Sequence, residues 1–249
     1  MMIRQLYDQE TSTYTYLIAD EDSGEAALID PVREQLERDL KLVHELGLTL
    51  RYVLETHVHA DHVTSAGTIA DQTGATTAAS QQGAACASQR LDDGAVVRLG
   101  SLEIRAIATP GHTRDSLSFY VPGHVFTGDA LLVRGTGRTD FQSGDAGQLY
   151  DSITQRLFSL PDATRVWPGH DYRGHSSSSI AEEKRWNPRL AGKSRQDFEQ
   201  IMQALKLAPP KHIDVAVPAN LACGRAKVPS QHAPDAAELQ APTRVAAPC

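Results

Sequence analysis

Three histidines and one aspartate fall within the stretch Thr56-His57-Val58-His59-Ala60-Asp61-His62, directly after the apolar residues 50–54. Imidazole nitrogens and carboxylate oxygens are common ligands of zinc and of other divalent transition metals. The spacing H-x-H-x-D-H allows all four side chains to reach one side of a tight turn between a strand and a helix. The stretch therefore predicts a metal site, and it leaves open which residues ligate, how many metals bind and which metal they are.

Three further candidate ligands, His112, Asp129 and His170, also follow short apolar runs. Each has a glycine beside it, in Pro110-Gly111-His112, Gly128-Asp129 and Pro168-Gly169-His170. A glycine at such a position allows the backbone turn that aims a side chain across the end of a strand. We therefore expect these residues to converge with the first stretch on one edge of the fold.

All the candidate ligands are nitrogen or oxygen donors, and no cysteine lies near them in the sequence, which favours zinc, iron or manganese. The set is His57, His59, Asp61, His62, His112, Asp129 and His170. It is large enough for two metals that share Asp129 and activate a bridging hydroxide for hydrolysis. Two histidines and one carboxylate also suffice for a single non-haem Fe(II) centre with open positions for substrate and dioxygen. Spacing does not choose between the two centres, and it leaves Asp61 and His170 open as residues that orient a ligand or contact the substrate.

Composition limits the classes of protein to consider. The chain has 249 residues, 41% of them hydrophobic, which suits one sizeable α/β domain with appendages. A net charge of −7 without any basic run argues against nucleic acid as a partner. We see no apolar stretch of the length of a signal peptide or a membrane span. The three cysteines, Cys86, Cys223 and Cys249, are too few and scattered for a disulfide framework, so we expect a reducing compartment, the cytoplasm.

The residues outside the candidate set have simpler interpretations. Five histidines are interpreted as surface residues, and Cys223 is interpreted as a plain thiol because no general base is identifiable beside it. These histidines are His44, His124, His175, His212 and His232. A non-catalytic metal-binding or sulfur-relay module that uses Cys223 remains a third kind of function.

Hydrophobic periodicity and turn residues predict mixed strands and helices. The expected strands are residues 12–20, 26–29, 50–54, 75–79, 96–99, 102–108, 116–121, 125–127 and 165–167, with an extended segment at 215–218. The expected helices are 30–46, with Asp30 as N-cap and Pro31 in the first turn, then 63–73, 145–160 and 194–205. Residues 226–249 are rich in alanine and proline and poor in large apolar groups, so we expect a disordered tail.

The four motifs together resemble the metallo-β-lactamase superfamily, whose fold is an αββα sandwich of the α/β class with metals at the strand-end edge. Within it, the chain resembles the persulfide dioxygenases, also called sulfur dioxygenases or ethylmalonic-encephalopathy-type proteins. The distinguishing residues are Ala60-Asp61-His62-Val63-Thr64, the segment from Thr127 to Gln142, Asn187-Pro188-Arg189-Leu190 and Val217-Pro218-Ala219-Asn220. The resemblance implies a catalytic core at 1–175, an accessory segment with helical character at 176–225 and the tail at 226–249.

The resemblance also implies a reaction and a site. A persulfide dioxygenase oxidises glutathione persulfide with O₂ to sulfite and glutathione at one Fe(II), whose ligands correspond here to His57, His112 and Asp129. In the same comparison His59, Asp61 and His62 would lie behind the ligands, and His170, Arg138 and Tyr172 would contact the substrate. A homodimer is compatible with this interpretation, and no membrane partner is expected.

The alternative is a two-zinc thioester hydrolase of the glyoxalase II type, acting on S-acylglutathione. Asp140 stands where that family has a tyrosine, which counts against it.

Overall fold

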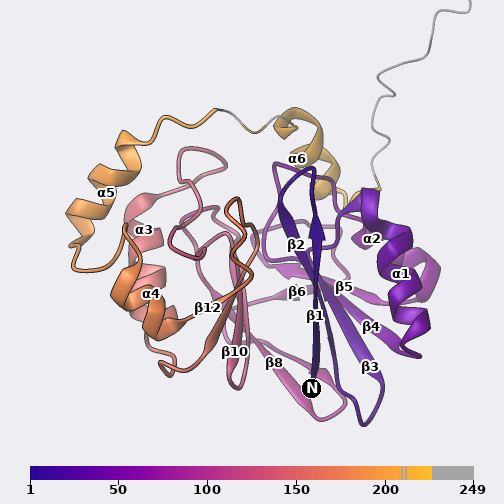
Figure 1. Ribbon diagram of the computed structural model, residues 1–249. Helices are drawn as coiled ribbons and strands as arrows, with labels where there is room; N and C mark the ends of the chain where they lie inside the picture. The colour runs from indigo at the N-terminus through magenta and orange to yellow at the C-terminus, as the bar shows by residue number, and fades with distance from the viewer. Residues whose placement is uncertain (209, 211, 226–249) are drawn as a thin grey trace, which may run out of the picture.

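Two six-stranded sheets packed face to face form the centre of the protein (Figure 1). The structure, a computed structural model, describes residues 1–208, 210 and 212–225. The first sheet has the strand order β1-β2-β3-β4-β5-β6 and the second the order β12-β11-β10-β9-β8-β7. Helices lie on the outer face of each sheet, which confirms the αββα sandwich (Figure 1).

The first sheet and its helices come from the first part of the chain. Its strands are β1 (Met2–Asp8), β2 (Thr13–Ala19), β3 (Glu25–Ile29), β4 (Thr49–Leu54), β5 (Thr76–Ser80) and β6 (Gln89–Leu91). The helices α1 (Leu36–Glu45) and α2 (Ala66–Thr73) cover its outer face. Strands β3, β4 and β5 are parallel neighbours, so their carboxyl ends lie at the same edge.

The second sheet is built from β7 (Val96–Leu99), β8 (Leu102–Ala108), β9 (Leu117–Val121), β10 (His124–Gly128), β11 (Arg165–Pro168) and β12 (Ser178–Ser179). Its outer face is covered by α3 (Ala146–Asp151), α4 (Ile180–Trp186) and α5 (Arg195–Ala204). The helix α6 (Ile213–Leu221) lies apart from these, at the rim of the sandwich (Figure 1). No helix among the described residues is long and apolar enough to cross a membrane.

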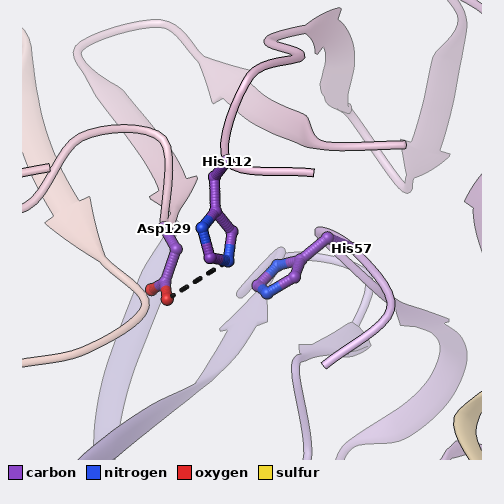
Figure 2. Close-up of side chains that lie close together, drawn as sticks. All are labelled: His57, His112 and Asp129. Atoms are coloured by element: carbon purple, nitrogen blue, oxygen red, sulfur yellow. Dashed lines mark ion pairs between the residues drawn. The ribbon is translucent and has the colours of Figure 1, made fainter. Parts of the chain in front are cut away.

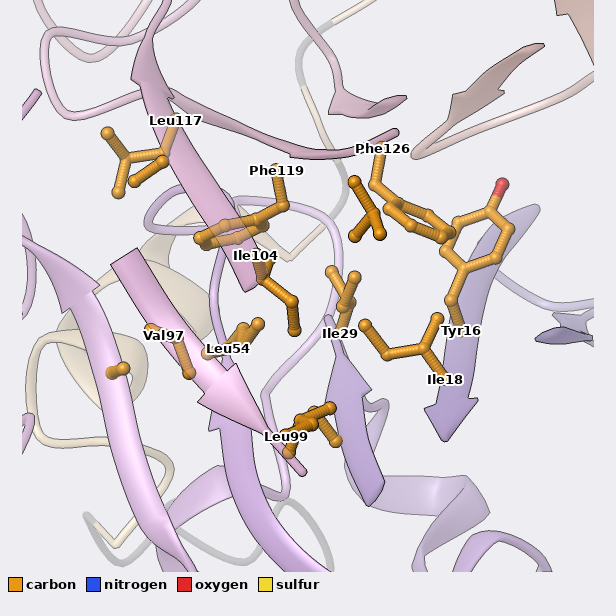
Figure 3. Close-up of a cluster of buried hydrophobic side chains, with 14 of the residues drawn as sticks. Tyr16, Ile18, Ile29, Leu54, Val97, Leu99, Ile104, Leu117, Phe119 and Phe126 are labelled. Atoms are coloured by element: carbon orange, nitrogen blue, oxygen red, sulfur yellow. The ribbon is translucent and has the colours of Figure 1, made fainter. Parts of the chain in front are cut away.

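The main core fills the space between the two sheets (Figure 3). Tyr16, Ile18 and Leu54 reach into it from the first sheet, and Phe119 and Phe126 from the second. The alternation of buried and exposed residues along β7 and β8 places one face of each strand in this core. Because the two packed sheets are rigid, the residues that directly follow their strands are held in fixed positions.

The sequence-based predictions missed the strands β1, β6 and β12, and they misjudged three further elements. The helix expected from Asp30 begins only at Arg33 as a 3₁₀ turn, and Asp30 is no N-cap but has a left-handed backbone, with φ of 50°. Residues 145–160 form α3 and then a π-helical turn over Ser152–Leu157. Residues 215–218, expected to be extended, belong to α6.

The expectation of a plain thiol at Cys223 is also wrong, because Cys223 forms a disulfide bond with Cys86, 137 residues earlier in the chain. The prediction failed because the two cysteines meet only through the fold, and pairing between distant positions does not follow from sequence alone. A reducing compartment no longer follows from the cysteines. The predicted disorder of 226–249 falls outside the described residues.

Candidate metal centre

The candidate ligands meet at one rim of the sandwich, as the sequence predicted. His57 follows β4, His112 follows β8, Asp129 follows β10 and His170 follows β11. Figure 2 shows His57, His112 and Asp129 pointing toward one another from separate segments of the chain. Each of the three offers one ligand atom, and these atoms all lie within 4.8 Å of one another. This spacing suits three ligands of one metal ion.

Hydrogen bonds leave one nitrogen of each histidine free to face the metal. His112 donates from Nδ1 to the carbonyl of Arg138 at 2.7 Å, and its Nε2 lies 3.7 Å from Asp129 Oδ2. The Nδ1 of His57 lies 2.9 Å from Thr56 Oγ1, which itself donates to Asp30 at 2.7 Å and so accepts from the imidazole. Partners of this kind fix the orientation and tautomer of histidines that bind metals. The residues therefore fit a metal site of two imidazoles and one carboxylate.

Burial and neighbouring charges together set the ionisation of His57 and Asp129. It lowers the pKa of His57 well below its usual value, and the neighbouring His59 and His112 lower it further, so His57 is a neutral donor. For Asp129, burial acts to raise the pKa, but His170 and His112 outweigh it and hold the carboxyl group ionised. Neutral imidazoles beside a carboxylate are the forms in which these groups ligate metals.

His170 lies between two carboxylates and contacts both. Its Nδ1 is 2.6 Å from Asp129 Oδ1, and its Nε2 is 2.9 Å from Asp61 Oδ2. Burial acts to lower the pKa of His170, but Asp129 and Asp61 raise it well above the usual value. In this arrangement His170 orients Asp129.

The expected supporting residues His59, Asp61 and His62 form a second group, with ligand atoms also within 4.8 Å of one another. Asp61 Oδ2 accepts a hydrogen bond from His62 Nδ1 at 2.8 Å. His59 Nε2 is 3.2 Å from Asp30 and 3.5 Å from Glu55, so two buried carboxylates face it. Burial opposes protonation of His59, yet these carboxylates raise its pKa well above the usual value. His59 thus faces two carboxylates outside this group, whereas Asp61 pairs with His62, whose Nε2 has no hydrogen-bond partner among the described residues.

A cavity of about 500 Å³ opens beside the metal centre. His112 and Asp129 line it, together with His170, Arg138 and Tyr172, the three residues expected to contact the substrate. The exposed Tyr172 ring stacks on His170, with the ring centres 5.9 Å apart. The cavity is large enough for a small peptide-like ligand.

Arg138 is already engaged in the structure. It donates to both carboxylate oxygens of Asp140 at 2.6 and 2.7 Å and to the carbonyls of Leu207 and Ala208. Its guanidinium carbon lies 4.2 Å from the centre of the Phe141 ring. These contacts fix the guanidinium at the mouth of the cavity.

Three arginines to which the sequence analysis gave no role, Arg134, Arg173 and Arg189, also line the cavity. Arg189 donates to the carbonyl of Thr136 at 2.7 Å, and its pKa is lowered by burial and by the nearby Arg173. Arg189 lies in the segment Asn187-Pro188-Arg189-Leu190, which carried part of the resemblance. That segment was the sequence feature from which a role at the site could have been predicted. The cavity is therefore basic on more than one side.

Comparisons with known proteins identify relatives of the chain. Residues 9–85 and 88–170 match the metallo-beta-lactamase superfamily. The chain is 44% identical over 227 residues to the mitochondrial persulfide dioxygenase ETHE1 of Homo sapiens, covering 90% of this chain and 89% of the human protein. It is 43% identical over 233 residues to the corresponding protein of Bos taurus, covering 92% and 91%.

Solved structures show the same relationship. The crystal structure of ETHE1 from Myxococcus xanthus shares 60% sequence identity, with a TM-score of 0.89 over 90% of this chain and all of that chain. A metallo-beta-lactamase structure from Staphylococcus aureus shares 27% identity, with a TM-score of 0.81 over 89% of this chain and 71% of that one. The chain therefore belongs to the metallo-β-lactamase superfamily and, within it, to the persulfide dioxygenase family.

Proposed function

We propose that the protein oxidises glutathione persulfide with O₂, giving glutathione and sulfite. The reaction balances as GSSH + O₂ + H₂O → GSH + H₂SO₃, in which the outer sulfur loses four electrons and O₂ gains them. The observation that carries the proposal is the cluster of His57, His112 and Asp129, two imidazoles and one carboxylate within ligand distance at the edge of a cavity.

The proposed cofactor is one Fe(II) per chain, held by these three residues. A centre with two histidines and one carboxylate keeps positions open for dioxygen and for a sulfur donor when iron is bound. The chain's own residues hold this arrangement. Arg138 fixes His112 through its carbonyl, Thr56 fixes His57, and His170 fixes Asp129.

Arg138 is the proposed anchor for a carboxylate of the glutathione part, since a guanidinium binds carboxylates through two parallel hydrogen bonds. Its present partner Asp140 is half exposed to solvent, at 54%. Asp140 binds the guanidinium in the same two-bond manner, so a substrate carboxylate competes with Asp140 for Arg138. Tyr172 and His170 form the opposite side of the proposed binding site.

Metal analysis together with oxygen uptake tests the proposal. We expect the protein loaded with Fe(II) to hold about one iron per chain and to consume O₂ only when glutathione persulfide is added. The two-zinc hydrolase predicts two zinc ions per chain and turnover of S-acylglutathione. Iron-loaded protein that consumes no O₂ with glutathione persulfide would contradict the proposal.

The variant His59→Ala separates the same two centres. In the one-iron centre His59 stands behind the ligands, so the variant keeps its iron, whereas a two-metal centre loses a metal with this histidine. The matched control is His44→Ala, which truncates an exposed histidine near the end of α1 and is expected to leave the metal content unchanged.

Location and assembly are further parts of the proposal. Cytoplasmic location stays a prediction, and the mammalian relatives named above are described as mitochondrial. A homodimer likewise stays a prediction, which sedimentation of the purified protein tests.

A further inference from the structure

Asn220, at the end of α6, is buried against the metal loop, which we define as residues 56–65. Its Nδ2 donates to the carbonyls of His59 at 2.9 Å and His62 at 2.8 Å. Its Oδ1 accepts from the amide of Thr64 at 2.8 Å. One side chain thus satisfies three backbone groups of a loop that forms neither helix nor strand around them.

These three bonds fix the turn that carries Asp61 and His62. A buried backbone group without a partner is costly, so the turn depends on Asn220 to keep this backbone path. Backbone groups do not replace these bonds within the described residues. The hydrogen bonds between the loop and other backbone segments involve Thr56, Val63 and Ser65 instead.

The turn is connected to the proposed ligands. Asp61 lies 2.9 Å from His170, which lies 2.6 Å from the proposed ligand Asp129. The ring of His59 packs against the ring of the proposed ligand His57, with centres 4.1 Å apart. A shift of the turn therefore reaches two of the three proposed ligands.

The helix that carries Asn220 is attached by a small apolar contact, by hydrogen bonds just beyond its end and by one covalent bond. Among the hydrogen bonds, Arg225 donates to Asp71 at 2.7 and 3.1 Å and to the carbonyl of Gly67 at 3.2 Å. Ala216 and Ala219 pack on Val63, which is a small apolar contact. The amide of Gly67 donates to the carbonyl of Cys223 at 2.9 Å. The covalent attachment is the bond between Cys223, three residues after Asn220, and Cys86 in the loop between β5 and β6.

We propose that Asn220 is a positioning residue for the metal centre and that the Cys86–Cys223 disulfide is its redox-sensitive anchor. The inference rests on the metal centre of the proposed function. Reduction by a monothiol such as glutathione breaks the bond and yields two protein thiols, while two molecules of the reductant lose two electrons and two protons and form their own disulfide. The end of α6 then moves more freely, and the metal loop loses part of its support.

The first test compares Asn220→Ala and Asn220→Asp with Leu221→Ala, a control that truncates the exposed neighbour on the same helix. Fe(II) is titrated anaerobically into metal-free protein, and hydrogen exchange is measured over residues 56–65. Loss of a residue that orients a metal site lowers affinity by roughly 10- to 100-fold, and we expect this range for Asn220→Ala. Asn220→Asp keeps the acceptor for Thr64 and loses both donors, so it should lose at least as much affinity.

Faster exchange of the metal loop should accompany the lower affinity in both Asn220 variants, while Leu221→Ala keeps the wild-type values. Folded Asn220→Ala that binds Fe(II) with wild-type affinity overturns the positioning role. A merely structural role lowers the thermal midpoint without changing the affinity of the folded protein.

The second test needs no change at Asn220. Protein carrying Cys249→Ser is reduced with a phosphine, freed of reductant anaerobically, and compared with its oxidised form and with a further Cys86→Ser variant. We expect reduction to weaken Fe(II) binding and to speed exchange of the metal loop, and the Cys86→Ser variant to show the weaker binding before and after reduction. Equal affinities in the oxidised and reduced forms overturn the anchor.

Both readouts are independent of turnover. Wild-type protein that binds Fe(II) but consumes no O₂ with glutathione persulfide removes the proposed reaction and leaves this inference intact. If the wild-type protein turns over glutathione persulfide and the Asn220 variants keep the wild-type affinity for Fe(II), the proposed reaction stands and this inference is removed.

Discussion

Gly111, the residue before His112, tests how strictly the sandwich holds its ligands. Its φ is 134°, and a Cβ placed on it would lie 2.5 Å from the Cβ of Leu149 and closer still to the backbone of that residue in α3. Carbon atoms in contact sit about 3.5–4.0 Å apart, so an alanine must push the helix backbone away by about 1 Å. The matched control is Gly123, whose φ is 85° and whose added Cβ would meet nothing within 4 Å.

Both substitutions place an alanine at a positive φ, but only Gly111→Ala also overpacks a neighbouring helix. A left-handed backbone costs an alanine about 1–2 kcal/mol, and we expect this loss alone for Gly123→Ala. Overpacking against a neighbour adds about 1–3 kcal/mol, which brings Gly111→Ala to about 2–5 kcal/mol. Because His112 follows directly, Gly111→Ala should also lower the affinity for Fe(II), whereas Gly123→Ala should leave it unchanged.

Urea denaturation of the metal-free proteins measures the loss of stability, and anaerobic titration with Fe(II) measures the affinity for iron. Equal losses of stability in the two variants, or wild-type iron affinity in Gly111→Ala, would refute the reasoning. Insoluble Gly111→Ala beside soluble Gly123→Ala is the extreme form of the expected result.

Three further outcomes are expected. Burial raises the pKa of Asp39 to about 6, so its ionisation opposes folding and stability falls as pH rises from about 4 to 6. Two pKa units amount to about 3 kcal/mol, the most that Asp39→Asn should gain in urea denaturation at pH 7, with little gain near pH 4. Arg138→Lys should raise KM for glutathione persulfide about tenfold with kcat unchanged, since a lysine lacks the planar fork; Arg98→Lys, at an exposed pair with Glu103, is the control. Phe119→Ala should cost about 3–5 kcal/mol by urea denaturation, because the ring is fully buried between the sheets, and unchanged stability would contradict the core described above.

The convergence of His57, His112 and Asp129 was predictable because each follows a strand, and strand ends are fixed by the sheets. Their separation in sequence was no obstacle, since the register of two packed sheets determines where strand ends meet. The roles of the individual residues at the rim did not follow from spacing. They depend on which nitrogen of each histidine is already bonded to a neighbour, and this is a property of the assembled site.

Asp30 shows a different limit of sequence reasoning. An aspartate before a proline is typical of a helix start, and here the carboxylate instead accepts from the amide and hydroxyl of Thr56, each at 2.7 Å. Tertiary contact thus outweighs the local capping preference. Residues 215–218 were misjudged for a simpler reason, because a short apolar run with one proline does not distinguish an extended segment from a buried helix.

The metal loop is held from several directions by side chains other than the three proposed ligands. Asp30 accepts a hydrogen bond from the amide of Thr56. Asp115 accepts from the amide of Val58, and Gln142 donates to the carbonyl of Val58, both at 2.8 Å. Asn220 holds the far part of the loop from α6.

These supports come from segments spread over the whole chain, and Gln142 belongs to the segment that distinguished this family within the superfamily. The H-x-H-x-D-H motif by itself therefore specifies only the kind of site. The geometry of the ligands, and with it the metal that binds and the reaction that follows, depends on residues that surround the loop. We expect a change at any of these supports to alter the proposed centre without changing a ligand.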